Sequence, residues 1–163
     1  MINLREIKNK IVTKNNLYCL CVISIIFFLD RYTKLYILNN FTENSYYLNN
    51  YMNFDLVWNT GIGFGLLQVE SSFVYNLISF LIGIVILILI FVSLYSKKFE
   101  KVIFTLIAGG AFGNFYDRIT YKAVPDFIDI HYGNFHWFTF NVADIFITFG
   151  IIIYLVKEAL IKK

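Results

Sequence analysis

The sequence predicts an all-α integral membrane protein with four transmembrane helices and a small extracytoplasmic β-sheet in the first outer loop. The membrane prediction rests on composition, because 58% of the 163 residues are hydrophobic and the mean hydropathy is +0.64. It also rests on four apolar segments that reach or approach the roughly 20 residues a helix needs to cross the hydrocarbon core. We expect the spans at about 17–38, 73–95, 102–118 and 137–156.

The four predicted spans differ in length, in charged residues and in the residues that flank them. The first follows a basic stretch but lacks a small-residue cleavage site, so it is expected to be an uncleaved span rather than a signal peptide. The second contains no charge, and the third is the shortest. The fourth contains a single charged residue, Asp144. No repeat or linker interrupts the chain, which indicates a single membrane domain over 1–163.

The outer loop at about 39–72 is predicted to be rich in β-structure. Apolar residues at 52, 54, 56 and 58 alternate with less apolar ones, the period of a half-buried strand. Asn59, Thr60 and Gly61 follow, with further glycines at 63 and 65 that permit close approach of another chain. Such a surface can hold an extended peptide by strand addition.

Basic residues predict the orientation, because cytoplasmic loops near span ends accumulate Lys and Arg. The loop at 39–72 contains neither residue type, which indicates an outer loop, and both termini are expected in the cytoplasm. The basic residues that flank the predicted spans on the inner side are Arg5, Lys8, Lys10, Lys14, Lys97, Lys98, Lys101, Lys157, Lys162 and Lys163.

Asp144 is the residue that most strongly suggests chemistry. An acid within the hydrocarbon costs at least a few kcal/mol, so it indicates a functional site with a partner. At about 1.5 Å of rise per residue, Asp30 and Asp144 lie at similar depths, ~10 to 12 Å from the outer face. Asp126 lies just upstream, and two neighbouring carboxylates share a proton near neutrality, giving a general acid beside a general base. Asp129 is an alternative partner.

Other polar residues gather at the same boundary. Asp30 and Lys34 have the i, i+4 spacing of an ion pair on one helix face. The third predicted span ends with Asn114, Asp117 and Arg118. Three strong polar groups at a membrane boundary need hydrogen-bond or ion-pair partners among one another. The side chains of adjacent helix residues point in different directions, so Arg118 is not expected to pair with Asp117. It is expected to reach another carboxylate, a phosphate or a carbonyl. Gly109 and Gly113 have the spacing at which helices pack closely.

Three alternatives stay open on these residues alone. His131 and His136 suggest a metal site with Asp126 and Asp129, but their spacing matches no zinc motif, so we predict no metal. A proton-coupled transporter would use Asp30 and Asp144 as relays. An assembly factor without enzymatic activity would use the outer sheet as a docking surface.

Taken together, these segments resemble the lipoprotein signal peptidase (signal peptidase II) family over most of the chain. No single segment is diagnostic, but their order and the predicted topology are specific. The matching segments are Asp30-Arg31-Tyr32-Thr33-Lys34, Asn59-Thr60-Gly61-Ile62-Gly63-Phe64, Gly109-Gly110-Ala111-Phe112-Gly113-Asn114-Phe115-Tyr116-Asp117-Arg118, Val124-Pro125-Asp126-Phe127 and Phe140-Asn141-Val142-Ala143-Asp144.

The resemblance implies an aspartyl endopeptidase that cuts diacylglyceryl-modified prolipoproteins before the lipidated cysteine. It implies a catalytic pair of Asp126 and Asp144. It further implies a multi-pass protein of the bacterial cytoplasmic (inner) membrane, with its active site toward the outer face. Its expected partners are the lipid-modified prolipoprotein and membrane lipids, without nucleic acid, cofactor or metal, and a monomer is expected. The residues that the resemblance places around the site are Asn59, Gly61, Asn114, Arg118, Asn141, Asp30 and Lys34.

The sequence departs from the family pattern at three positions. Arg31 stands where a neutral amide is usual, Gly63 where Ala or Ser is usual, and Pro125 where an aliphatic residue precedes the first catalytic acid. Proline removes a backbone donor and fixes φ, so the path into Asp126 is expected to differ.

Overall fold

The computed structural model describes residues 11–42, 45–61 and 71–161, and within them four long helices and a four-stranded antiparallel sheet make up most of the chain. The glycine-rich stretch after Gly61 lies outside the described residues, and so do the basic residues before 11 and after 161. The helices are α2 (Lys14–Asn40), α3 (Ser72–Tyr95), α4 (Lys98–Tyr121) and α5 (Val142–Ile161). The strands are β1 (Tyr46–Asn49), β2 (Met52–Asn59), β3 (Val124–Tyr132) and β4 (Phe135–Phe140).

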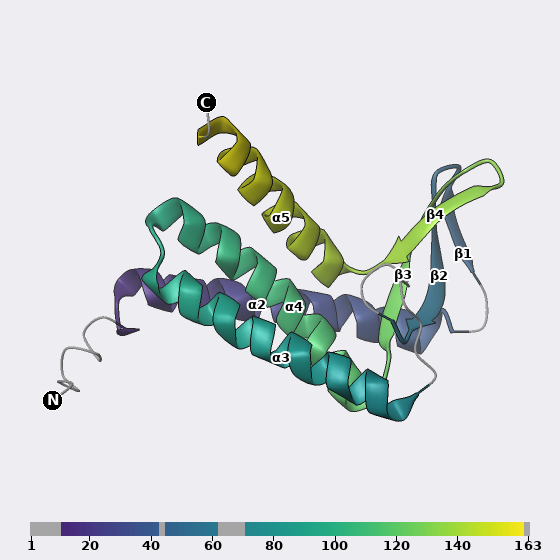
Figure 1. Ribbon diagram of the computed structural model, residues 1–163. Coiled ribbons are helices and arrows are strands. Elements are labelled where there is room, and N and C mark those ends of the chain that lie inside the picture. Colours follow the sequence, from purple (N-terminus) through teal and green to yellow (C-terminus); the bar gives the residue numbers. More distant parts are fainter. Residues whose placement is uncertain (1–10, 43–44, 62–70, 162–163) are drawn as a thin grey trace, which may run out of the picture.

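The helices form a bundle around α4, and the sheet lies at one end of this bundle. Figure 1 shows α2, α3 and α4 side by side, with α5 leaving the sheet end at an angle. Helix α4 contacts each of the other three helices. The carboxyl ends of α2 and α4 and the amino ends of α3 and α5 lie toward the sheet (Figure 1). The polar segments at these ends are therefore brought together.

Glycines let α4 approach its neighbours. A Cβ atom on Gly109 would lie 3.0 Å from Ile26 of α2, and one on Gly113 would lie 2.6 Å from the Asp30 carboxylate. This confirms that the Gly109 and Gly113 spacing serves helix packing. Gly110 makes the closest approach to α5, since a Cβ there would lie 2.4 Å from the carbonyl oxygen of Ala143.

We expect Gly110→Ala to destabilise the protein by about 1 to 3 kcal/mol, because overpacking forces the α5 backbone away from α4. Gly83→Ala is the matched control, since its Cβ would meet only the Phe115 ring, at 3.1 Å, where a side-chain adjustment suffices. Thermal unfolding in detergent measures both. Equal midpoints for the two variants would show that the α4 to α5 contact tolerates a methyl group.

The membrane-spanning prediction is confirmed only in part. Helices occupy all four predicted segments at least partly, but among the described helices α3 alone is long and apolar enough to cross a membrane by length and composition. The other three contain charged residues within their length, including Asp30, Asp117 and Asp144. The protein is thus mostly helical with a small antiparallel sheet.

The fourth predicted span was wrong at its start. Residues 137–140 belong to strand β4, and α5 begins only at Val142. Aromatic and β-branched side chains at these positions fit a pleated, half-buried surface, which favours pairing with β3. Asp144 therefore lies in the first turn of its helix rather than two turns inside it.

The predicted strand over 52–59 is confirmed as β2, but the sheet is not confined to the first outer loop. Strands β3 and β4 lie between helices α4 and α5, and the sheet order is β1-β2-β3-β4. Gly133-Asn134 between two β-prone runs is a hairpin signal, and Gly133 has a φ of 58°, a value that glycine readily adopts. Pairing of β2 with β3 joins the segment before α3 to the segment after α4.

Candidate active site

Strand pairing places Asp126 at the centre of a polar site. In the β2 to β3 register Val57 pairs with Asp126 and Asn59 pairs with Val124. Asn59 therefore lies on the neighbouring strand, two residues along from the partner of Asp126. The Asn59 amide donates to Asp126 Oδ2 at 2.8 Å, and the Asn141 amide donates to Asp126 Oδ1 at 2.6 Å. Both carboxylate oxygens of this buried acid are therefore held by neutral donors.

Asn141 and Asp144 cap the start of α5 reciprocally. The Asn141 side-chain oxygen accepts from the Asp144 backbone N–H at 3.1 Å, and Asp144 Oδ2 accepts from the Asn141 backbone N–H at 3.1 Å. This is a capping box, which satisfies two donors that a helix start leaves open. The helix dipole also favours a negative charge in the first turn. These contacts explain how an acid is held in this apolar segment.

Asn141 links the two acids, because its amide contacts Asp126 while its other polar groups contact Asp144. The second oxygen of Asp144, Oδ1, accepts from the Asn114 amide of α4 at 2.8 Å. Each of the four oxygens of the acid pair thus accepts a hydrogen bond, which fixes the orientation of both carboxylates.

Lys34 forms the centre of a buried ionic network behind this pair. Its ammonium donates to Asp30 Oδ2 at 2.7 Å, to Asn114 Oδ1 at 2.8 Å and to Asp117 Oδ2 at 2.7 Å. The side chains of Lys34, Asp30 and Asp117 are fully buried. The predicted Asp30 to Lys34 pair is confirmed, and Asp30 Oδ1 also accepts from the Ala143 backbone at the start of α5, at 3.0 Å.

Arg31 supplies a contact that the sequence interpretation missed. It forms an ion pair with Asp117, donates to the Tyr121 hydroxyl at 3.1 Å and lies over the Tyr116 ring. Two acids, Asp30 and Asp117, are therefore balanced by two cations, Arg31 and Lys34. The departure from the usual neutral amide is accommodated by the carboxylate and aromatic rings of α4.

The hydrogen-bond partner of Arg118 is a backbone carbonyl and not its neighbour Asp117. Its guanidinium donates to the Gly61 carbonyl at 2.7 Å, and the Gly61 backbone N–H donates to the Asn59 side-chain oxygen at 2.9 Å. One of the three expected partners, a carbonyl, is thus the one observed. The contact fastens the chain after β2 to α4 and so fixes Asn59, which holds Asp126.

The environment shifts the acidity of the Asp126 side chain. Burial raises the pKa of Asp126 to about 7, and the negative charge of Asp144 adds to the rise. The hydrogen bonds from Asn59 and Asn141 act in the opposite direction but do not cancel it. A carboxyl group with this pKa gains and loses a proton near neutrality, as a general acid or base requires.

An apolar pocket opens beside Asp144, one acid of the pair. It has a volume of about 480 Å³ and includes Asp144 among its lining residues. Strand β4 and helix α5 provide most of the lining, including Trp137, Phe138 and Phe149. A ligand with apolar groups can thus lie next to a titratable carboxylate.

The structure brings together all of the site residues expected from the sequence. Asp129, the alternative partner for Asp144, instead contacts the two histidines of the β3 to β4 hairpin. Pro125 is the second residue of β3 and pairs with Trp58 of β2. Gly63 lies outside the described residues.

Known proteins resemble this chain over most of its length. A lipoprotein signal peptidase of Pelagibacter ubique (strain HTCC1062) is 50% identical over 153 residues, which cover 92% of each chain. One from Dichelobacter nodosus (strain VCS1703A) is 40% identical, over 84% of this chain and 91% of the relative. A solved structure described as a bacterial membrane enzyme is 27% identical with a TM-score of 0.70, covering 90% of this chain and 92% of that one.

The comparison with families agrees with these relatives. The family model described as "Signal peptidase (SPase) II" matches residues 22–160, a range that contains every residue of the site described above. With most of the chain matched, and with a relative at 50% identity, the chain belongs to the signal peptidase II family.

Proposed function

We propose that the protein is a membrane aspartyl endopeptidase that removes signal peptides from diacylglyceryl-modified prolipoproteins, cleaving before the lipidated cysteine. The observation that carries this proposal is the pair Asp126 and Asp144, which Asn141 links at the edge of an apolar pocket. Relatives named lipoprotein signal peptidase support the substrate class.

One acid of the pair acts as a base and takes a proton from water, which attacks the scissile carbonyl carbon. The protonated partner donates a hydrogen bond to the carbonyl oxygen and then transfers its proton to the leaving amine nitrogen as the C–N bond breaks, so the pair again holds one proton. The raised pKa of Asp126 supports this division, because a shared proton stays on the pair near neutral pH. The carboxylate pair is sufficient for this sequence of steps.

Neutral amides are suited to positioning the pair. Asn59, Asn114 and Asn141 orient the carboxylates without adding a charge that would fix their protonation state. Behind them, the ionic network of Asp30 and Lys34 holds α2 against α4 and the start of α5. Arg118 holds Gly61, and through it the position of Asn59.

The arrangement also supports a topology. We propose that α2, α3, α4 and α5 cross the bacterial inner membrane, with both termini cytoplasmic and the sheet on the outer face. Apolar side chains such as Phe149, Ile152 and Leu155 are exposed along α5, as lipid-facing residues would be. A lipid-bearing substrate would then reach the pocket beside Asp144 from the bilayer, and a monomer suffices for this.

The transporter alternative receives less support. A proton relay needs titratable groups across the thickness of the membrane. Asp30, Asp117, Asp126 and Asp144 instead share one hydrogen-bonded site at the sheet end. Along the described residues of α5, no acid lies between Asp144 and Glu158.

The proposal is tested with purified protein and one precursor in two forms, with and without the diacylglyceryl group. We expect cleavage of the lipidated form only, and a shift in electrophoretic mobility of the precursor measures this cleavage. A precursor in which the lipidated cysteine is replaced by serine is the matched control. Equal cleavage of both forms would contradict the lipid-dependent substrate class, and proton flux into proteoliposomes without cleavage would support the transporter.

The pH dependence of stability follows from the raised pKa of Asp126. The folded state binds this proton more tightly than the unfolded state, so the contribution to stability is fully present below about pH 4 and is lost as pH rises through about 7. Between pH 5 and pH 8 the loss is about 2 to 3 kcal/mol, at about 1.36 kcal/mol per pKa unit. Asp126→Asn should show a smaller decrease in unfolding temperature over this range.

The control for this experiment is Asp55→Asn, which changes an exposed acid on β2 that accepts from Ser45. It should keep the pH dependence of the parent protein. An Asp126→Asn variant that follows the same pH curve as Asp55→Asn would show that Asp126 does not hold a proton near neutral pH.

A further inference from the structure

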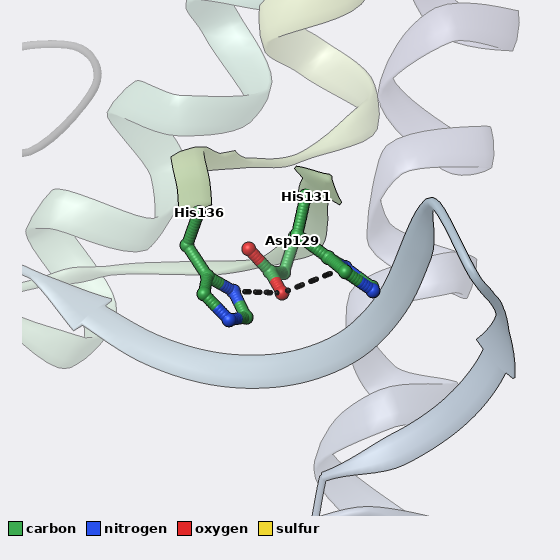
Figure 2. A group of neighbouring side chains, drawn as sticks. All are labelled: Asp129, His131 and His136. Carbon is green, nitrogen blue, oxygen red and sulfur yellow. Dashed lines mark hydrogen bonds and ion pairs between the residues drawn. The ribbon is translucent and has the colours of Figure 1, made fainter. Parts of the chain in front are cut away.

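A second cluster of titratable side chains lies on the β3 to β4 hairpin. Asp129 Oδ2 lies 2.8 Å from Nδ1 of His136 and 3.5 Å from Nδ1 of His131. Figure 2 shows the carboxylate of Asp129 between the two imidazole rings. One ligand atom from each residue lies within 4.8 Å of the other two. Two imidazoles and a carboxylate are the side chains that bind zinc and related divalent transition metals.

Strand pairing creates this cluster. His131 and His136 are direct partners in the β3 to β4 register, so their side chains stand on the same face of the sheet. Asp129 precedes His131 by two residues on β3 and shares that face. A register shift between Asp129 and His131 leaves Trp137 and Phe138 together opposite Ile130, which is a bulge on β4. Without this bulge, strand alternation would place His136 on the other face.

The cluster is separate from the acid pair. Alternation along β3 puts Asp126 and Ile130 on one face and Asp129 and His131 on the other. Ile130 lines the pocket that contains Asp144. The two histidines and Asp129 are therefore not part of the proposed peptidase chemistry.

Two buried atoms at this cluster lack hydrogen-bond partners among the described residues. One is Nδ1 of His131, which lies 3.5 Å from Asp129 Oδ2 without forming a hydrogen bond and whose side chain is only 9% exposed. The other is Oδ1 of Asn53, the residue directly opposite Asp129 in the β2 to β3 register and hence on the same face. Buried polar atoms normally form hydrogen bonds, so two that form none, beside a carboxylate, indicate a ligand.

We propose that His131, His136 and Asp129 form a binding site for Zn²⁺ or another divalent transition metal of similar ligand preference. Tetrahedral coordination at about 2.0 to 2.2 Å separates ligand atoms by about 3.3 to 3.6 Å. The 3.5 Å separation between Asp129 Oδ2 and Nδ1 of His131 lies in this range, and the 2.8 Å separation from Nδ1 of His136 would lengthen by about 0.5 Å on metal binding. His136 binds the metal through Nδ1, the ring atom that lies 2.8 Å from Asp129 Oδ2. Asn53 or water completes the coordination.

This proposal differs from the sequence-based expectation of no metal. That expectation rested on the five-residue spacing of the histidines and the lack of a helical motif. The hairpin turn and the β4 bulge supply the proximity that the linear spacing does not show. Bound metal would cross-link β3 to β4, next to the Trp137 and Phe138 wall of the apolar pocket.

Zinc binding by the full-length protein in detergent tests the proposal. Histidine and cysteine are the nitrogen and sulfur side chains that bind zinc strongly, and the sequence contains two of each. A protein without a histidine tag, with Cys19→Ser and Cys21→Ser, therefore keeps only His131 and His136 of these side chains. Competition with a chromogenic zinc chelator measures the affinity. We expect one Zn²⁺ per chain, weakened at least about tenfold in His136→Ala and in Asp129→Asn.

Two further variants control the test. Asp55→Asn removes an exposed acid from the same sheet and should bind zinc as the parent does. His136→Cys keeps a zinc ligand on the exposed side of the hairpin and should restore the binding lost in His136→Ala. Zinc should also raise the unfolding temperature of the parent but not of His136→Ala. Parent binding no tighter than that of His136→Ala would overturn the proposal.

Discussion

Replacing either Asp126 or Asp144 by Asn is expected to lower the rate of cleavage of a lipidated precursor by at least about 10³-fold, because in the proposed mechanism each acid has a proton-transfer role that an amide cannot perform. The two side chains act as one unit, so the double variant should be no slower than either single variant. Single-turnover cleavage by purified enzyme measures the chemical step directly.

The control for both replacements is Asp55→Asn, which changes an exposed acid on β2 that lies apart from the site. Thermal unfolding of each variant shows whether the fold is kept, since Asn at 126 places an amide against the donors of Asn59 and Asn141. A well-folded Asp126→Asn or Asp144→Asn variant that retains cleavage at a rate near that of Asp55→Asn would refute the assigned pair.

Replacing Lys34 by Met should be the most damaging change outside the acid pair. The ammonium satisfies oxygens of Asp30, Asn114 and Asp117, and all three side chains are buried. Removing one partner leaves buried charge uncompensated, which destabilises a protein by about 3 to 5 kcal/mol. The expected result is a strongly lowered unfolding temperature and little folded protein.

Lys157→Met is the matched control, since Lys157 pairs with Glu100 at 2.6 Å in a partly exposed position. That pair should contribute less than about 1 kcal/mol, as exposed ion pairs do. A second variant, Asp30→Asn with Lys34→Met, tests the coupling, because neutralising the acid should recover part of the loss. Equal effects of Lys34→Met and Lys157→Met would contradict a buried network.

Local pattern predicted the helices and one strand well. Long apolar runs gave four helices near their expected positions, and the alternation over 52–59 gave β2. Helix α4 continues about one turn beyond the predicted end of its segment, to Tyr121, because its polar residues bond to other helices instead of ending the helix. Such tertiary contacts are not visible in hydropathy.

The start of α5 was mispredicted for a different reason. Trp137, Phe138 and Phe140 are as apolar as a membrane helix requires, and only pairing with β3 makes them a strand. The signal that marks the true helix start is Asn141 three residues before Asp144, a reciprocal cap. The Gly133-Asn134 turn marks the hairpin in the same way.

Prediction of the site residues needed both helix geometry and the resemblance to a known family. The i, i+4 pair of Asp30 and Lys34 followed from helix geometry, whereas the pairing of Asp126 with Asp144 followed from resemblance. The link through Asn141, the contact of Arg31 with Asp117 and the Asp129 cluster depend on residues that lie far apart in the chain or on a bulged strand. No sequence spacing specifies these contacts.

The position of the scissile bond tests the central claim most directly. Purified protein is incubated with a lipidated precursor, and both products are identified by mass spectrometry, with the Asp144→Asn variant prepared in parallel. The account predicts a mature product that begins with the diacylglyceryl-modified cysteine, a released signal peptide with a free carboxyl terminus, and neither product from Asp144→Asn. Cleavage at another bond, or the same products from a folded Asp144→Asn protein, would contradict it.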